Sequence, residues 1–331
     1  MDFLDKVLLE WSARTEKGYP DLNNEQDLAI FESMFGFKLN EDSINDAGSF
    51  DRFLHTRYAV DGQEIINTDN FFTNLNKSSN KEQLLSLILN SGKKSLKTSH
   101  DTFSKLEKEL FDIIMGTVKI PNGEPSELWF AIVYDGKIKG GVAGKTGITS
   151  DVEINGQGIS LKNYNKIDNV DFGSLGNTVQ ELLRDSVNLF QLLTGSSVTK
   201  TLTGPSMNKV LDLISTPEVV NDIEEILKLG QDTSIPTIKR LATLIEDNLE
   251  ERDPSSMVSK FCSGIDSNVK NKLNKVEWWG IIYNDVCHIE SSKDLFEKLR
   301  CKENRLSPFV KSFKDFHLYI NGKMVYQEVI S

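Results

Sequence analysis

The strongest constraint on the fold is a run of alternating apolar and polar residues that continues through a tight turn at Asn155-Gly156. Val152 and Ile154 precede the turn, and Ile159 and Leu161 follow it. Asn-Gly is favoured in two-residue hairpin turns because both positions there need a positive φ angle. Successive strand side chains point to opposite faces. We therefore expect an antiparallel hairpin over residues 150–164 with one apolar and one polar face.

The polar face of this hairpin carries groups suited to catalysis. Asp151 and Glu153 share it with Ser160 and Lys162 if the apolar residues share the other face. Two carboxylates held together repel unless a cation lies between them, and Mg²⁺ prefers oxygen ligands. A bound metal polarises a phosphoryl oxygen, and a lysine offsets charge in the transition state or orients the attacking water. The pattern thus predicts Mg²⁺ or Mn²⁺ held by Asp151 and Glu153, in a metal-dependent nuclease.

An acidic residue interrupts the apolar stripe of a helix predicted over residues 100–115. Phe103 and Leu110 belong to the stripe, Asp101 or Thr102 is available as the N-cap, and Glu107 lies on the apolar face. Two interpretations remain open for Glu107. It is either a glutamate at the edge of the stripe that reaches solvent or a functional carboxylate.

The remaining pattern predicts an α/β or α+β fold, with a mixed sheet flanked by helices. An apolar run, Leu128–Tyr134, reads as a strand covered on both faces, and Asp135-Gly136 reads as a turn into a strand over 137–142. Further segments are expected as follows: an amphipathic helix from Leu175 to Leu193, a helical insertion over about 205–275 that ends in a helix at Pro254–Leu273, and returning strands over 276–331, with a strand at Val276–Tyr283 and a hairpin over Phe316–Val329.

The negative charge of the chain is concentrated at its start. The formal net charge is −11, and residues 1–80 hold 15 acidic against 7 basic residues. Residues 93–166 hold 11 basic against 9 acidic residues, so a nucleic-acid site there is compatible with the acidic total. We expect an acidic, helical N-terminal module over residues 1–78 and an α/β domain over 93–331 with its core at 100–195. The first 90 residues read as short helices.

The order of these elements resembles the PD-(D/E)xK, or restriction-endonuclease-like, nuclease superfamily. The similarity covers residues 100–195 and runs from the helix with Glu107 through the hairpin with Asp151 and Lys162 to the helix after Leu175. It implies that Asp151 binds the metal, that Lys162 is the lysine of the motif and that DNA is the substrate. Ser160 occupies the position usually held by Glu or Asp, so Glu153 or Glu107 would supply that carboxylate, and Ser150 replaces the usual proline.

A glycine-rich stretch around residues 140–144 precedes the hairpin. It lacks the helix that a P-loop requires. It reads either as a turn between strands or, within the nuclease interpretation, as a loop that contacts the DNA backbone through Lys137, Lys139 and Lys145.

The first 40 residues are similar to an N-terminal segment of proteins from large tailed phages. This likeness implies a viral origin and a separate N-terminal module. No secretion signal or membrane-spanning run is present in the sequence, so we expect a cytoplasmic protein, in the host cell if the gene is viral. A homodimer and a protein partner for the acidic module are both left open.

The main alternative function is a non-enzymatic structural or interaction protein on a nuclease-like scaffold. Lys162 would then form surface ion pairs with Asp151 or Glu153 on a solvated face. The four histidines are scattered and no serine or cysteine stands in a context that favours a nucleophile. The three cysteines are too few and too irregularly spaced for a disulfide framework or a zinc site.

Overall fold

The computed structural model describes residues 44, 46–60, 65–90, 94–121, 123–139, 150–165, 169–175, 201–203, 208–209, 211–212, 254–314 and 317–322. These residues form a mixed α/β structure, as the sequence predicts. The segments predicted at 1–43, 140–149, 176–200 and 213–253 lie outside the described residues, and with them the expected helix at Leu175–Leu193.

The chain divides into two compact units. Unit 1 takes its described residues from Met1–Lys94 and Glu109–Gly140, and unit 2 from Ser95–Lys108 and Gly141–Ser331. This division differs from the boundary expected near residue 78, because residues 109–140 group with the N-terminal part of the chain. Helix α6 (Lys105–Thr117) crosses the division.

The described residues of unit 1 are mainly helical, in agreement with the short helices predicted up to residue 90 as far as residues 47–90 are concerned; the helices predicted before residue 44 lie outside the described residues. It contains α3 (Ala47–Tyr58), α4 (Thr68–Lys77), α5 (Lys81–Asn90) and α7 (Pro125–Tyr134), and a parallel pair formed by β1 (Ala59–Val60) and β3 (Lys137–Lys139). Its core gathers fully buried aromatic and aliphatic side chains: Phe50, Leu54, Tyr58, Phe71, Leu75, Leu84, Ile88 and Trp129.

The segment Leu128–Tyr134 is a helix, so the predicted strand there is wrong. Pro125 is at the start of α7, and Glu124 and Glu127 form a reciprocal capping box with each other's backbone N–H groups. Every described side chain from Ser126 to Tyr134 is buried. A helix covered on all sides has the same continuous apolar run as a buried strand, and the capping signals decide between them. Asp135, in the left-handed region with φ 54°, ends this helix before β3.

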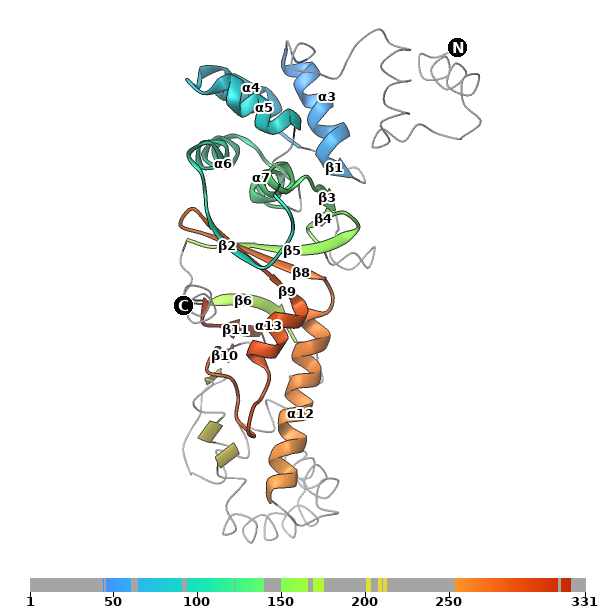
Figure 1. Ribbon diagram of the computed structural model, residues 1–331, viewed down its shortest axis with the longest axis vertical. Helices are drawn as coiled ribbons and strands as arrows, with labels where there is room; N and C mark the ends of the chain where they lie inside the picture. Colours follow the sequence, from blue (N-terminus) through green and yellow to red (C-terminus); the bar gives the residue numbers. More distant parts are fainter. Residues whose placement is uncertain are drawn as a thin grey trace, which may run out of the picture. The chain divides into compact units, whose positions relative to one another are not determined.

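Unit 2 contains a mixed sheet in which five strands follow one another in the order β4-β5-β8-β9-β2. They are β2 (Ser99–Thr102), β4 (Val152–Ile154), β5 (Gln157–Asn163), β8 (Trp278–Tyr283) and β9 (Val286–Ser291). Strand β5 runs parallel to β8, and the other neighbours are antiparallel. The predicted strand at Val276–Tyr283 is confirmed by β8. Figure 1 shows β5, β8 and β9 side by side.

A second, four-stranded sheet in unit 2 has the order β6-β11-β10-β7. Its strands are β6 (Val170–Ser174), β7 (Thr201–Thr203), β10 (Val310–Lys314) and β11 (His317–Ile320). The predicted hairpin over Phe316–Val329 is only partly described: β11 is its first strand, and residues after 322 lie outside the described part. Strand β11 pairs with β10 and β6.

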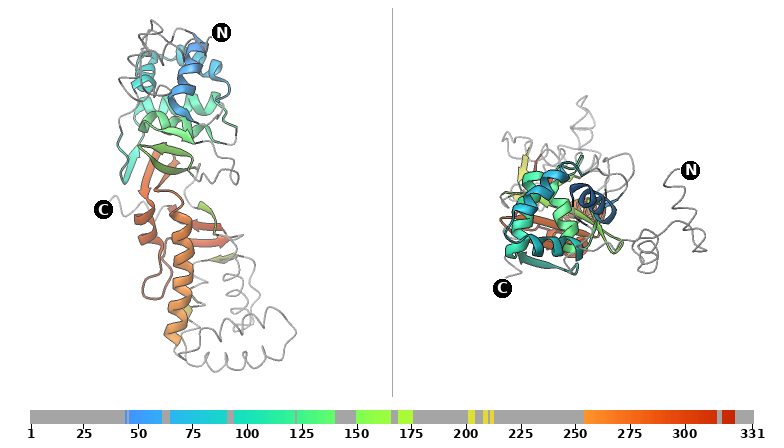
Figure 2. Two further views of the ribbon diagram at one scale, coloured as in Figure 1. Left: turned by 90° about the vertical axis from the view of Figure 1, so that its right-hand side faces the viewer. Right: turned by 90° about the horizontal axis from the view of Figure 1, so that it is seen from above.

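Helix α12 (Pro254–Leu273), confirmed as predicted, runs along the four-stranded sheet and packs against α13 (Ser292–Leu299) (Figure 2). Its C-terminal end is anchored to both sheets' strands. Trp279 on β8 donates its indole N–H to the Leu273 carbonyl at 3.4 Å, and its ring lies 4.6 Å from that of Phe172 on β6. The end of α12 is therefore held where β6 and β8 approach each other.

Candidate functional site

The hairpin that the sequence predicts is present as β4 and β5. Asn155 and Gly156 form its turn with φ angles of 50° and 78°, the left-handed values that this turn needs. Val152 is opposite Ile159, and Glu153 is opposite Gly158.

The predicted sorting of side chains between the two faces is confirmed. Val152, Ile154, Ile159 and Leu161 are all buried. The register and the alternation along each strand put Glu153, Ser160 and Lys162 on the other face. The polar groups of two strands therefore meet on one side of the sheet, as a shared site requires.

Asp151 comes directly before the first residue of β4, and its carboxylate joins this face. Its Oδ2 accepts a hydrogen bond from the Leu161 backbone N–H at 2.6 Å and one from the Ser160 hydroxyl at 3.1 Å. The side chain thus continues the hydrogen bonding between β4 and β5 past the first residue of β4. Oδ1 accepts no hydrogen bond from the described residues.

The pKa of the Asp151 carboxyl is raised above its ordinary value of 3.8, because burial disfavours the charged form. The Leu161 N–H, the charge of Lys162 and the Ser160 hydroxyl act in the opposite direction, in that order of size. Burial prevails over all three. A cation near Oδ1 would lower this pKa again, because it favours the ionised form.

Lys162 contributes a half-buried ammonium group to this face. It forms no ion pair or hydrogen bond with any described residue, although its charge acts on Asp151. The surface ion pairs considered as the alternative for Lys162 are therefore absent from the described part of the chain. Glu153, also half-buried, lies on the same face through its position opposite Gly158.

Glu107 has a structural partner that the sequence interpretation missed. Its side chain is 7% exposed, and its Oε2 accepts the Ser104 backbone N–H at 2.7 Å while its own N–H donates to the Ser104 hydroxyl at 3.3 Å. This reciprocal cap begins helix α6. The expected N-caps Asp101 and Thr102 are wrong, because both belong to β2. The expectation that Glu107 reaches solvent is wrong as well.

Two of the three lysines predicted to contact DNA lie in the described part of the chain. Lys137 and Lys139 lie on β3, in unit 1, and both are half-buried. Lys145 lies outside the described residues. The site described within unit 2 contains Asp151, Glu153, Ser160 and Lys162.

Three residues beside the site were not singled out from the sequence. Lys272, near the end of α12, lies close enough to Lys162 for the two charges to interact. Asp171 on β6 accepts the Gly173 backbone N–H at 2.6 Å and pairs with His317 Nδ1 at 3.0 Å. More than a hundred positions separate Lys162 from Lys272 in the sequence, so no local pattern predicts their approach.

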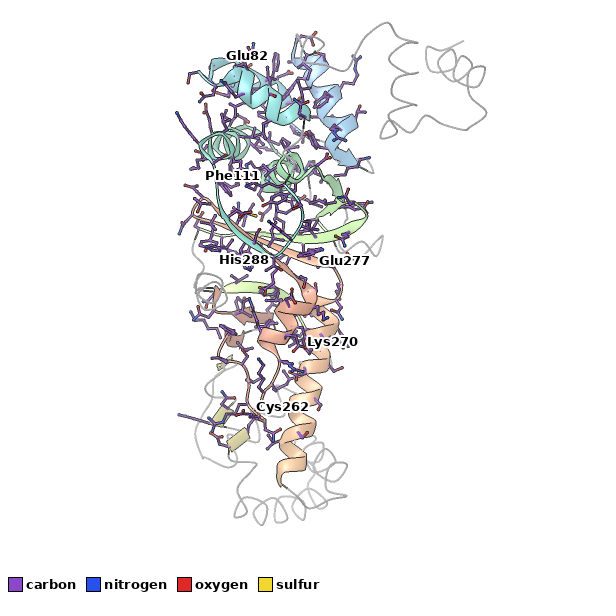
Figure 3. The ribbon with its side chains drawn as sticks, viewed as in Figure 1. Glu82, Phe111, Cys262, Lys270, Glu277 and His288 are labelled. Atoms are coloured by element: carbon purple, nitrogen blue, oxygen red, sulfur yellow. The ribbon has the colours of Figure 1, made fainter. Side chains whose placement is uncertain are left out.

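A buried charged network lies further along the same face of the sheet. Trp279, beside Ser160, is paired with Glu290, and Ile281, beside Lys162, is paired with His288. Glu290 is 2% exposed and pairs with Lys298 Nζ on α13 at 2.7 Å and with His288 Nε2 at 3.2 Å. Figure 3 shows His288 within the sheet and Glu277 at the start of β8. This network ties α13 to the sheet.

The donor set suits a magnesium ion better than a metal with many protein ligands. Within the described ranges, no group of three or more His, Cys, Asp or Glu side chains is arranged to hold a metal. Mg²⁺ commonly uses only one or two carboxylates and completes its shell with water and phosphate oxygens. Asp151, with Oδ1 available, and Glu153 on the same face fit that requirement.

Comparison of the chain with protein-family models, curated proteins and solved structures finds no significant match. The described helices also include none with the length and apolar character needed to cross a lipid bilayer. The function therefore has to be inferred from the site itself.

Proposed function

We propose that the protein is a Mg²⁺- or Mn²⁺-dependent nuclease that hydrolyses phosphodiester bonds of DNA at the β4–β5 hairpin. The observation that carries the proposal is a half-buried carboxylate, Asp151, with one oxygen that accepts no hydrogen bond from the described residues, on the same sheet face as the ammonium of Lys162, which forms no ion pair within the described ranges. A partly desolvated acid whose pKa is shifted and on which a nearby lysine acts is an arrangement typical of catalytic sites. The predicted resemblance to PD-(D/E)xK nucleases agrees with it.

Each residue has a role that follows from its contacts. Asp151 and Glu153 would hold the ion, and Ser160 and the Leu161 N–H fix the orientation of the Asp151 carboxylate. The ion, when bound, supplies polarisation of a phosphoryl oxygen and a lowered pKa for water. Lys162 stabilises the negative charge that grows on the phosphate as water adds to phosphorus and the P–O bond to the leaving oxygen breaks. In this scheme the protein acts in the cytoplasm, that of the host if the gene is viral.

Cleavage assays on purified full-length protein test the proposal. Linear duplex, single-stranded and branched DNA, with RNA as a comparison, are incubated with Mg²⁺, with Mn²⁺ or with EDTA. We expect metal-dependent cleavage of at least one DNA substrate. Lys162→Ala and Asp151→Asn should each reduce it by roughly 10²–10³-fold, the usual effect of removing one charged group from a transition state.

Lys293→Ala is the matched control, since Lys293 is an exposed lysine of the same unit that has no contact with the site. It should cleave like the unaltered protein. Full activity in both Asp151→Asn and Lys162→Ala would remove the assignment, as would equal cleavage in EDTA.

A non-enzymatic interaction protein is the second candidate. It is favoured by the structural partners of two of the acids: Asp151 closes the end of β4, and Glu107 caps α6. The same experiment decides between the two. Absence of cleavage with every substrate and both metals would support the interaction protein and exclude the nuclease.

A further inference from the structure

Two of the three cysteines lie where helix α12 packs against the chain that follows α13. Cys262, on α12, is 5% exposed, and Cys301, two residues after the end of α13, is half-buried. The third, Cys287, lies on β9 opposite Asp101 of β2. All three are free thiols. Cys262 and Cys301 are far apart in the sequence, so local spacing does not reveal them as a pair.

The packing of α12 against α13 brings these two cysteines together. The two helices run antiparallel, because contacts that move toward the start of α12 move toward the end of α13. Those contacts join the following pairs: the Leu273 carbonyl with the Ser292 hydroxyl at 2.9 Å, Lys270 Nζ with the ring centroid of Phe296 at 5.8 Å, and Asp266 Oδ1 with the backbone nitrogen of Cys301 at 2.9 Å. Cys262 follows on the same stripe of α12, one turn before Asp266 (Figure 3).

Backbone hydrogen bonds hold Cys301 over that turn of α12. Its N–H donates to Asp266 Oδ1. Helical side chains lean toward the N-terminus of their helix, so a group bound by the Asp266 carboxylate lies over the turn that carries Cys262. Directly after Cys301, Lys302 and Arg305 exchange backbone hydrogen bonds at 2.8 and 2.9 Å, which close a tight turn. Cys301 is therefore fixed on both sides.

The two thiols form a hydrogen bond with each other. The Cys301 S–H donates and the Cys262 sulfur accepts. This bond lowers the pKa of Cys262 below its ordinary 9.0, although burial and the charge of Asp266 act in the opposite direction, and it raises the pKa of Cys301. The thiolate, which is the reactive form of cysteine, therefore forms first on Cys262. A thiol of lowered pKa next to a second thiol is the arrangement found in redox-sensing cysteine pairs.

We propose that Cys262 and Cys301 are a reversible redox site, which a small peroxide oxidises to a disulfide that clamps α12 to the chain after α13. The Cys262 thiolate attacks a peroxide oxygen, so that an S–O bond forms and the O–O bond breaks. The Cys301 thiolate then attacks the sulfur of the Cys262 sulfenic acid, so that the S–S bond forms and the S–O bond breaks. Each hydroxide leaves as water with one of the two thiol protons, and two electrons pass from the thiols to the peroxide. A dithiol reductant reverses the oxidation by exchange.

Peptide mapping of full-length protein tests this proposal. The reduced protein is treated with hydrogen peroxide, the remaining free thiols are alkylated, and the digest is analysed without reduction by mass spectrometry. We expect two peptides joined through Cys262 and Cys301, which dithiothreitol separates again. Cys287→Ala is the matched control and should give the same joined peptides.

Single variants separate the two chemical steps. Cys301→Ala should stop at the sulfenic acid of Cys262, which dimedone labels, and Cys262→Ala should give no joined peptides. Oxidation of the unaltered protein should also raise the midpoint of thermal unfolding by roughly 5–15 °C, because the disulfide closes a loop of about 40 residues. Neither single variant should show this rise.

Four results would overturn the proposal: Cys262 and Cys301 that both stay free thiols in peroxide, a disulfide that involves Cys287, disulfides that form only between two chains, and a joined pair that leaves the unfolding midpoint unchanged. The peptide map uses the unaltered protein, so it remains decisive even if a cysteine variant does not fold. Cleavage of DNA plays no part in these measurements, so their outcome is separate from that of the proposed function.

Discussion

Replacing Asp151 separates its structural contribution from its chemical one. The carboxylate is the acceptor for the Leu161 N–H and the Ser160 hydroxyl. Asp151→Ala removes that acceptor and leaves a strand N–H without a partner in a half-buried place, which costs about 1–3 kcal/mol of the free energy of unfolding. Asp151→Asn keeps an oxygen in the same position and removes only the charge. We expect Asn to be at least as stable as Asp at neutral pH, while both variants lose cleavage.

The pH dependence follows from the direction of the pKa shift. Because burial raises the pKa of Asp151 above 3.8 in the folded protein, the folded state holds this proton more tightly than the unfolded state. The free energy of unfolding of the unaltered protein therefore falls as pH rises from about 3.8 through the raised pKa of Asp151. The Asp151→Asn variant has no titrating group at this position, so its free energy of unfolding does not fall for this reason. The gain in free energy of unfolding of Asp151→Asn over the unaltered protein should be absent at low pH. It should reach its full size above the raised pKa of Asp151.

Amide hydrogen exchange and urea unfolding measure these effects. The Leu161 amide should exchange faster in Asp151→Ala and should stay protected in Asp151→Asn. Equal protection of Leu161 in the Ala variant would show that Asp151 does not close the strand end. An Asn variant as unstable as the Ala variant would refute the assigned cost of the buried charge.

Three further changes test the fold. Trp129→Ala should cost about 3–5 kcal/mol by urea unfolding because Trp129 is fully buried in α7; a cost below 1 kcal/mol would contradict the buried helix. Gly156→Ala should destabilise the hairpin by about 1 kcal/mol because φ is +78°, whereas Gly116→Ala, at a helical position with equally open space, should stabilise by up to about 1 kcal/mol; effects of the same sign would count against the turn. Lys298→Met should cost about 3 kcal/mol, since it leaves Glu290 buried without its cation; unchanged thermal stability would show that the pair is not buried as described.

The hairpin could be predicted because its information is local. Asn155-Gly156 fixes the turn, and the alternation around it fixes both the register and the face of each side chain. The helix at Pro254–Leu273 and the strand β8 were predicted for the same reason. The strand predicted at Leu128–Tyr134 failed because a continuous apolar run reports burial and not backbone shape.

The partners of the acids could not be predicted in the same way. Glu107 lies on the apolar face of the helix in both interpretations of the sequence. Its hydrogen bond with Ser104 depends on where α6 begins. The two residues that the sequence suggested as the N-cap belong to β2 instead. Helix boundaries are weakly determined by local propensity. The choice between a catalytic and a capping carboxylate therefore needs the structure.

The sequence by itself determined which residues of the hairpin share a face, because strand periodicity and turn chemistry act between neighbours in the chain. Only the tertiary structure decided what lies beside that face. The parallel pairing of β5 with β8 and the end of α12 bring Lys272 to Lys162 across more than a hundred positions. Such contacts depend on how whole elements pack, and packing selects partners by shape and burial that no short stretch of sequence records.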